Sequence, residues 1–346
     1  MQFAFTEDQL AINLAAREML VDSCTPADLR RLLASGEARD EARWTAITGM
    51  GLLGMLAPES ADGMGLELTD FIAIAEAAGY VGLPEPLVEL AGITIPLLAR
   101  LRDQGFADPG DLLGAAIGGT VIALGHPAGR LVADADTAIA IVMADGDALH
   151  IVERIDTRIV RQESFDPFRR LFAVYWAPSS ASLAGTGWGD TATRGAILAA
   201  AQMIGLAQRC IDMSVAYARD RSQFGKPIGS YQAVKHLLAS AQVKVEFARP
   251  VVHAAAAELP LGTPAVRARA AHAKIAAGAA ADLAARTAVQ VHGAMGITWE
   301  VDVHFFLKRI LVLRSAWGAE AAHMETVIDR ITSLPTGPDA TFASAR

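Results

Sequence analysis

Long stretches of apolar residues at helical spacing dominate the second half of this chain. Apolar side chains recur at steps of three and four from Ile197 to Val215 and again from Val234 to Ala248. Such spacing gathers them on one stripe of a helix, so each stretch predicts a long amphipathic helix. A third helical run, 265–291, is rich in alanine, whose small side chain lets neighbouring helices approach closely. We expect Pro250 to kink or end the second helix, because proline lacks the backbone N–H donor.

The first 118 residues also have a helical character. Good helix formers alternate there with turns rich in proline and glycine. Thr6 followed by Gln9 is the pattern of a capping box, in which each side chain accepts a hydrogen bond from the other residue's backbone N–H. Apolar residues at helical spacing over 66–78 predict a further helix, which we expect to end at Gly79.

The composition changes to short apolar, β-rich runs between residues 119 and 182. Gly, Asp and Pro bound these runs, which is typical of short strands joined by turns. They predict a small antiparallel sheet with strands near 120–124, 138–142, 149–152 and 171–176. The whole chain is thus predicted to be α+β and mostly α, with an N-terminal helical domain (1–118), a small β domain (119–182), a C-terminal helical bundle (183–333) and a flexible tail (334–346).

Composition and charge argue against several classes of function. The net charge of −8 gives no reason to expect a nucleic-acid partner. Cys24 and Cys210 are far apart and have no CxxC spacing, so we expect neither a metal site nor a redox dithiol. No uninterrupted apolar run reaches the length of about 18 residues that spans a membrane. The N-terminus has no signal-peptide pattern, and we therefore expect a cytoplasmic protein.

Two segments carry residues suited to binding a phosphorylated ligand. The first, 219–228, supplies the planar guanidinium of Arg221, which suits a pyrophosphate, and the ring of Phe224, which suits a flat ring system. The second, 290–297, is glycine-rich, and glycine lets a backbone approach a ligand closely. Taken alone, each segment also fits a simpler structure, namely a turn between two helices or a helix ended by glycine.

Together, these segments resemble the acyl-CoA dehydrogenase family. Residues 221–236 resemble its pattern R-x-x-FG-x-x-I…FQ-x-x-x-H, and residues 290–297 resemble its Q-x-x-GG-x-G. Residues 5–9 and 55–65 are similar to its opening helix and its PE-x-x-GG-x-G turn. The resemblance covers nearly the whole chain. It implies a helical domain, a β domain and a C-terminal four-helix bundle, with FAD as cofactor and an acyl-CoA thioester as substrate.

The resemblance also assigns residues to the cofactor. In this family the arginine, the phenylalanine and the Q-x-x-GG-x-G loop grip the FAD of a neighbouring subunit on its pyrophosphate and adenosine side. The corresponding cofactor-binding residues here are Arg221, Phe224, Ile228, Gln290, Gly293 and Ala294. Ala294 stands where the family has its second glycine, a change that a contact through the backbone tolerates.

The family's catalytic glutamate is missing from both of its usual positions. That carboxylate removes an α-proton from the thioester, with a pKa raised by a dry pocket, while a β-hydride passes to the flavin. Trp317 occupies the position near the C-terminus, and Gly195 occupies the alternative position in the first bundle helix. The flavin-ring motif T-E-P-x-x-G-S-D is also lost at 123–129, in a shortened β domain. We therefore expect no catalytic residue in this chain.

These losses imply the non-catalytic subunit of a heteromeric acyl-CoA dehydrogenase. A homologous catalytic subunit would supply the glutamate in an α2β2 assembly, as in bacterial enzymes of the family that act on steroid side-chain CoA thioesters. Electron-transfer flavoprotein would accept the electrons. One alternative is a self-sufficient homomer with a relocated base, either Glu320, one helical turn beyond Trp317, or Asp190. The other is a helical scaffold or CoA-binding module without redox activity.

Overall fold

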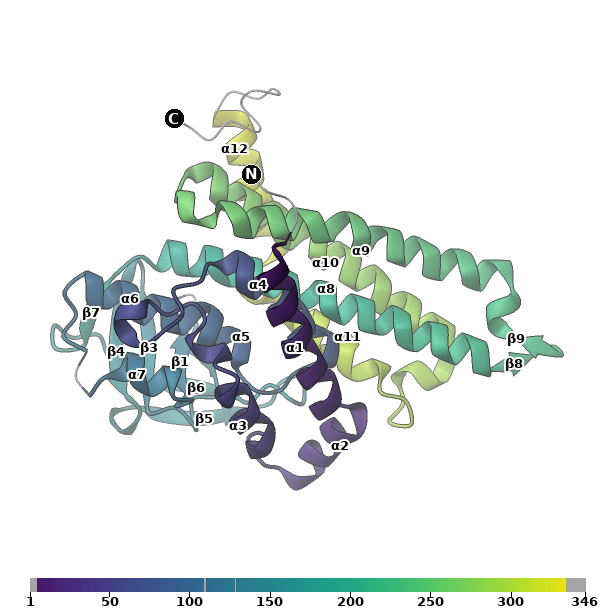
Figure 1. Cartoon of the computed structure of the whole chain (residues 1–346), viewed down its shortest axis with the longest axis horizontal. Coiled ribbons are helices and arrows are strands. Elements are labelled where there is room, and N and C mark those ends of the chain that lie inside the picture. The colour runs from purple at the N-terminus through teal and green to yellow at the C-terminus, as the bar shows by residue number, and fades with distance from the viewer. Residues whose placement is uncertain (1–4, 109, 128, 334–346) are drawn as a thin grey trace. The chain divides into compact units, whose positions relative to one another are not determined.

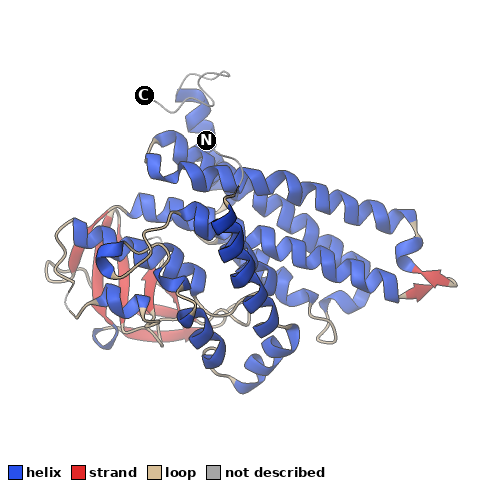
Figure 2. Ribbon diagram, viewed as in Figure 1, coloured by secondary structure: helices blue, strands red, loops and turns tan. Residues whose placement is uncertain are grey.

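The computed structural model of the chain describes residues 5–108, 110–127 and 129–333 (Figure 1). The chain divides into two compact units, Met1–Gly195 and Ala196–Arg346, and the boundary falls inside one long helix. Helices predominate, and a sheet of short strands lies in the first unit (Figure 2). The fold class is therefore α+β and mostly α, as the sequence predicts. The tail expected at 334–346 lies outside the described residues.

The helices of the first unit begin and end where local hydrogen bonds dictate. They are α1 (Glu7–Ser23), α2 (Pro26–Ser35), α3 (Glu41–Gly49), α4 (Leu68–Val81), α5 (Leu87–Glu89), α6 (Ile95–Asp103) and α7 (Leu112–Ile117). The capping box predicted at the start of α1 is confirmed. Thr6 Oγ1 accepts from the Gln9 N–H at 3.2 Å, and Gln9 Oε1 accepts from the Thr6 N–H at 2.9 Å. A π-helical turn, Leu90–Thr94, links α5 to α6.

Helix α4 does not end at Gly79, as predicted, but continues to Val81. Its C-cap is Gly82, which has the left-handed conformation (φ 67°) and whose N–H donates to the Gly79 carbonyl. Val81 is buried, so an additional apolar contact extends the helix past the first glycine. Gly79 is buried inside the helix, where its small size serves packing.

The sheet has seven strands in the order β5-β6-β2-β1-β3-β4-β7. The strands are β1 (Ile122–Gly125), β2 (Leu131–Ala133), β3 (Ala140–Asp145), β4 (Ala148–Glu153), β5 (Arg158–Gln162), β6 (Leu171–Tyr175) and β7 (Leu183–Thr186). The four strands predicted from the sequence are confirmed as β1, β3, β4 and β6. The prediction of a wholly antiparallel sheet is wrong, because β1 and β3 run parallel, with Ile122 opposite Ala140. The chain forms β2 beside one edge of β1 and then crosses to the other edge, so β3 enters in the direction of β1.

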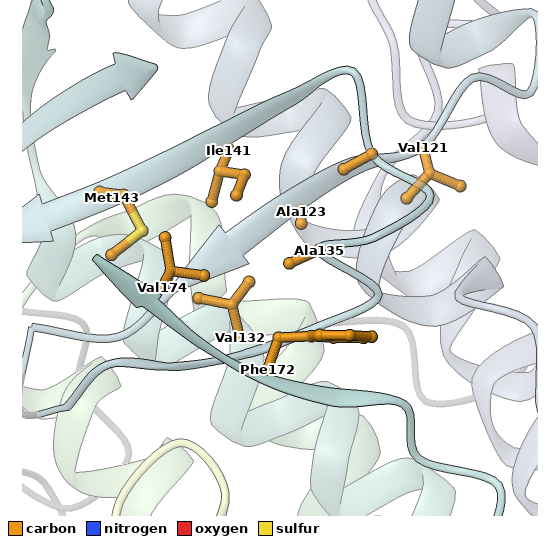
Figure 3. Packing of buried hydrophobic residues seen from close by; sticks show 9 residues of the cluster. Val121, Ala123, Val132, Ala135, Ile141, Met143, Phe172 and Val174 are labelled. Carbon is orange, nitrogen blue, oxygen red and sulfur yellow. The ribbon is translucent and has the colours of Figure 1, made fainter. Parts of the chain in front are cut away.

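The core of the sheet lies where β1, β2, β3 and β6 face one another (Figure 3). Its buried side chains are Val121, Ala123, Val132, Ala135, Ala138, Ile141, Met143, Phe172 and Val174. At the end of β1 the side chains pack closely around Gly125. A Cβ at Gly125 would lie 2.5 Å from the sulfur of Met143, so a larger residue there would require the Met143 side chain to move.

A buried ion pair joins the N-terminal helices. Arg43 in α3 donates from Nε to Glu85 Oε2 at 2.7 Å and from Nη2 to Oε1 at 2.6 Å. The Nη1 group of Arg43 donates to the Ser23 carbonyl at the end of α1, at 2.8 Å. Both charged side chains are almost fully buried. The pair therefore holds α1, α3 and the loop after α4 in one arrangement, with its charges matched and hydrogen-bonded.

The long helices carry the second unit. They are α8 (Trp188–Asp220), which begins in the first unit, α9 (Gln232–Glu258), α10 (Pro264–His292), α11 (Val303–Ser315) and α12 (Glu320–Ser333). The three long helices predicted from periodicity are confirmed as α8, α9 and α10. Pro250, which we expected to kink or end its helix, does not end it, because α9 continues to Glu258. Buried Ala248, Val252 and Ala255 extend the apolar stripe on both sides of the proline, and this packing outweighs the missing backbone donor.

Glu85→Gln would remove the nearer counter-charge of the buried Arg43 guanidinium and leave only Asp40, whose Oδ2 lies 3.9 Å from Nη1. We expect a loss of about 3–5 kcal/mol in the free energy of unfolding, the usual effect of breaking a buried pair. Urea unfolding followed by circular dichroism measures this loss. Arg31→Ala is the control, because it removes exposed ion pairs with Asp28 and Asp40 and should cost at most about 1 kcal/mol. Equal losses in the two variants would show that the buried pair contributes no more than an exposed one.

Candidate functional site

The segment 219–228 folds into a small hairpin that follows α8. Its strands are β8 (Ser222–Gln223) and β9 (Lys226–Pro227), joined by a two-residue turn. Both turn residues are left-handed, with φ of 52° at Phe224 and 82° at Gly225. This pair of angles suits a tight hairpin turn, but it strains a phenylalanine, which has a Cβ. The Tyr231 hydroxyl donates to the Gln223 carbonyl at 3.0 Å and braces the hairpin from the next helix.

The tip of the hairpin presents an aromatic ring to solvent. Phe224 is 92% exposed, and Arg221 beside it is exposed as well. Ile228 is half-buried at the base of the hairpin, where its N–H donates to the Arg221 carbonyl at 2.8 Å. A strained turn that holds a phenyl ring in water gains nothing for this chain alone. The same ring becomes useful when another molecule covers it.

The second predicted segment begins at the end of α10. Gln290, Gly293 and Ala294 are all exposed, and a Cβ at Gly293 would meet open space. Gly293 ends the helix with φ 63°, and a short 3-10 helix, Gly293–Ile297, follows. Inside it Gly296 is required, because a Cβ there would lie 2.9 Å from the backbone of Val289. Gly293 thus ends α10, as expected of a helix ended by glycine, and the exposed residues 293 and 294 begin an open segment after it.

Two stacked rings bring the predicted segments to the same end of the bundle. Tyr217, one turn before Arg221 on α8, stacks on His292 of α10 with ring centroids 4.3 Å apart. His292 is buried, and its Nδ1 lies 2.8 Å from the Ala288 carbonyl. Burial lowers the pKa of His292, so the ring is neutral at pH 7 and Nδ1–H donates to that carbonyl. The stack fixes the ends of α8 and α10 beside each other, from which both segments project.

The turn that carries Trp317 connects α11 to α12. Trp317 has φ 59° and Gly318 has φ 106°, so the turn passes through two left-handed residues. A Cβ at Gly318 would lie 2.8 Å from His323 Nε2 in α12, which makes glycine necessary. Lys274 Nζ of α10 donates to the Ala316 carbonyl at 2.6 Å and to the Arg314 carbonyl at 3.3 Å. The ammonium group thus caps the end of α11 and holds the turn in place.

Lys274 makes the environment of this turn cationic. Its side chain is buried, and burial together with the nearby Arg314 charge lowers the pKa of Lys274 to about 8. Burial and then the Lys274 charge lower the pKa of His323 as well. The turn that carries Trp317 is therefore held by a buried cation.

The other candidate positions for a base offer no poised carboxylate. Gly195 is buried in α8 and has no ionisable group. Asp190 is exposed and lies 3.4 Å from Arg100 Nη1. Glu320 is exposed and binds Arg314, with Oε2 3.0 Å from Nη2. The chain between Trp317 and Glu320 forms a turn and not a helix. Helical spacing therefore does not place Trp317 and Glu320 on one face.

Sequence reasoning missed the role of Lys274. The signal was available, because a single lysine interrupts the apolar face of the alanine-rich helix between Ala273 and Ala277. Its ammonium group donates to the carbonyls of Arg314 and Ala316, at the end of a helix some 40 residues further along the chain. A local sequence pattern cannot predict a contact at that distance.

The cysteines and acidic side chains suggest no further chemistry. Within residues 5–108, 110–127 and 129–333, no cluster of three or more His, Cys, Asp or Glu side chains could hold a metal ion. In the same ranges no helix is long and apolar enough to cross a membrane. Cys24 and Cys210 are buried, and burial raises the pKa of the Cys210 thiol to about 12, which keeps it protonated and unreactive.

Comparison with known proteins identifies the family. The family model for the acyl-CoA dehydrogenase N-terminal domain matches residues 6–100, and that for the C-terminal domain matches residues 188–332. The chain belongs to the acyl-CoA dehydrogenase family, whose members are FAD-dependent oxidoreductases.

Several relatives resemble the chain over nearly its full length. Acyl-CoA dehydrogenase IpdE2 of Mycobacterium tuberculosis is 33% identical over 304 residues, which cover 88% of this chain and 91% of that protein. A chain of the ChsE4-ChsE5 complex from Mycobacterium tuberculosis has the same fold, with a TM-score of 0.84 at 22% identity over 97% of this chain and 100% of that one. The Tcur3481-Tcur3483 steroid ACAD also has this fold, with a TM-score of 0.81 at 23% identity. The match covers 94% of this chain and 98% of that one.

Lys274 makes stability depend on pH in the alkaline range. Its folded pKa of about 8 lies below the ordinary value of 10.5, so the unfolded chain binds more protons between these values and stability rises with pH. The rise should approach about 3 kcal/mol from pH 8 to pH 10.5. Lys274→Met should abolish this part of the slope, as measured by urea unfolding at several pH values. Lys244→Met, at an exposed lysine of α9, should keep the slope; a slope unchanged in Lys274→Met would contradict the assignment.

Proposed function

We propose that this chain is the non-catalytic subunit of a heteromeric, FAD-dependent acyl-CoA dehydrogenase. It supplies the hairpin tip and the Gln290–Ala294 loop to an FAD shared with a homologous partner, and the partner supplies the catalytic glutamate. The observation that carries the proposal is Phe224, 92% exposed on a strained turn. A ring held in water at such a turn is explained by burial against a cofactor in another subunit.

The exposed residues fit the pyrophosphate and adenosine side of FAD. The guanidinium of Arg221 suits the pyrophosphate, because its fork donates two parallel hydrogen bonds. Phe224 offers an apolar face, and Ile228 supports the base of the same hairpin. Gln290 can donate and accept at once, and open space at Gly293 lets the backbone amides of 293 and 294 approach the ligand. When bound, FAD would accept the hydride that leaves the β-carbon of the thioester.

Proton abstraction is assigned to the partner because this chain lacks a suitable base. Removing an α-proton requires a group that is unprotonated and free to accept near neutral pH. Trp317 has no such group, and Lys274 beside it is a cation whose donors serve two carbonyls. Glu320 is paired with Arg314 in the exposed part of the turn, which argues against the homomer with a relocated base. Retention of the exposed Arg221 and Phe224 argues against a scaffold without redox activity.

The related structures support the choice of partner and substrate. ChsE4-ChsE5 is a complex of two differently named chains, and Tcur3481-Tcur3483 is a steroid ACAD. We extend both properties to this chain, as an α2β2 assembly acting on an acyl-CoA, specifically a steroid side-chain CoA thioester. Electron-transfer flavoprotein is the proposed electron acceptor, as the family resemblance implies.

Co-expression tests the subunit assignment. The chain is purified alone and together with a homologous dehydrogenase partner, and the flavin absorbance and FAD-to-protein ratio are recorded. We expect the lone chain to be colourless and the pair to hold one FAD per two chains. A lone chain with one FAD per subunit, bleached by an acyl-CoA, would overturn the proposal and make Glu320→Gln the next variant to examine.

Phe224→Ala separates cofactor binding from folding. Because Phe224 is exposed, we expect its loss to leave the melting temperature of the lone chain unchanged or slightly higher, since the strained turn relaxes. In the co-expressed pair, FAD retention should fall about tenfold or more, as expected for losing one aromatic contact with a bound ring. Equilibrium dialysis against free FAD measures the dissociation constant. Ile155→Ala is the matched control, since Ile155 is 84% exposed and lies in the sheet-containing unit; an equal effect there would refute the specific role.

A further inference from the structure

The register of the hairpin places two cations on one face of the ribbon. Gln223 lies opposite Lys226 in the pairing of β8 with β9. The Ile228 N–H donates to the Arg221 carbonyl at 2.8 Å, so the pairing continues to these two residues. Side chains two positions apart on a strand, and those directly opposite on its partner, point to the same face. The side chains of this face are Arg221, Gln223, Lys226 and Ile228.

This chain neutralises neither of the two cations. Arg221 and Lys226 are both exposed, on a hairpin that projects past the ends of α8 and α9 (Figure 1). Among the described residues, no carboxylate forms an ion pair with either side chain. The hairpin therefore offers two positive charges, side by side on neighbouring strands, to another molecule.

The ring of Tyr231 holds the Lys226 ammonium group in place. Lys226 Nζ lies over this ring, 4.3 Å from its centroid. Because the Tyr231 hydroxyl also donates to the Gln223 carbonyl, at 3.0 Å, one tyrosine contacts both strands of the hairpin. A cation–π contact orients an ammonium group but leaves its charge uncompensated and N–H donors available. Lys226 is thus ordered before an anion binds, which reduces the entropy lost on binding.

The charge of the pyrophosphate calls for a second cation. The proposed function assigns only Arg221 to this part of FAD, yet each of its two phosphate groups carries one negative charge at neutral pH. One guanidinium can match one of these charges. A second cation on the same face of the same hairpin completes the match.

We propose that Lys226 is a second phosphate-binding residue of the FAD site, positioned beside Arg221 by Tyr231. This inference rests on the proposed function, because it requires FAD to lie against the hairpin. It extends that function by assigning the second phosphate group to a side chain.

Lys226→Met tests the assignment in the co-purified pair, because it removes the charge and keeps the length of the side chain. The dissociation constant of FAD is measured by equilibrium dialysis at several sodium chloride concentrations. We expect it to rise about tenfold or more at low salt, as for losing a hydrogen bond between charged groups. The affinity of the variant should also depend less on salt, because salt screens the interaction that has been removed.

Two further variants separate charge from packing. Lys226→Arg restores the charge and the contact with the Tyr231 ring, so it should bind FAD within about threefold of the unmodified pair. Lys244→Met is the matched control, since Lys244 is an exposed lysine further along α9 and should change neither the affinity nor its salt dependence. The melting temperature of the lone chain should be unchanged in Lys226→Met, because this side chain is exposed.

The outcomes distinguish this assignment from the proposed function. If Lys226→Met binds FAD as tightly as the unmodified pair, the assignment of Lys226 is overturned and the proposed function stands. A loss that Lys226→Arg does not reverse, or that is equally large at high salt, overturns the assignment as well, because Lys226 would then act through packing. An unmodified pair that binds no FAD overturns both.

Discussion

Close packing along the alanine face of α10 determines the arrangement of the bundle. The buried alanines of this face are Ala270, Ala271, Ala273, Ala277, Ala280, Ala281, Ala284, Ala285 and Ala288. Their small side chains allow the axes of neighbouring helices to approach closely, and α9, α11 and α12 all contact α10. The same helix carries Lys274 to the Trp317 turn and His292 to Tyr217. At a rise of 1.5 Å per residue these points are about 27 Å apart, so one helix positions two separate sites.

Much of the fold could be predicted because its signals are local. Periodicity reports the long helices, and the Thr6 capping box marks the start of α1. Distant packing overrides a local rule at two residues: α4 passes its predicted end at Gly79, and Pro250 does not end α9, because buried side chains continue beyond both residues. The parallel pairing of β1 with β3 depends on the path of the chain between them, and periodicity carries no information about that path. The strands β2, β5 and β7 are short or largely exposed, which weakens their apolar pattern.

The sequence proposes the residues of the candidate site, but their geometry is seen only in the fold. The motif at 221–228 gives the order of the side chains, yet the left-handed backbone at Phe224 and the exposure of its ring appear only in the fold. Gln290 and Gly293 could be paired with the hairpin only by resemblance, because the Tyr217–His292 stack that joins the two helix ends leaves no mark in the sequence.

The exposed hairpin has a consequence for how the chain is made in the cell. A newly folded chain carries at one tip a bare phenyl ring and a two-stranded ribbon with open edges, features that favour aggregation. If a partner subunit covers the Phe224 ring, the ring stays exposed to solvent until the subunits assemble. Synthesis of the two subunits side by side, in matched amounts, would shorten that interval, and an excess of this chain would accumulate as insoluble protein.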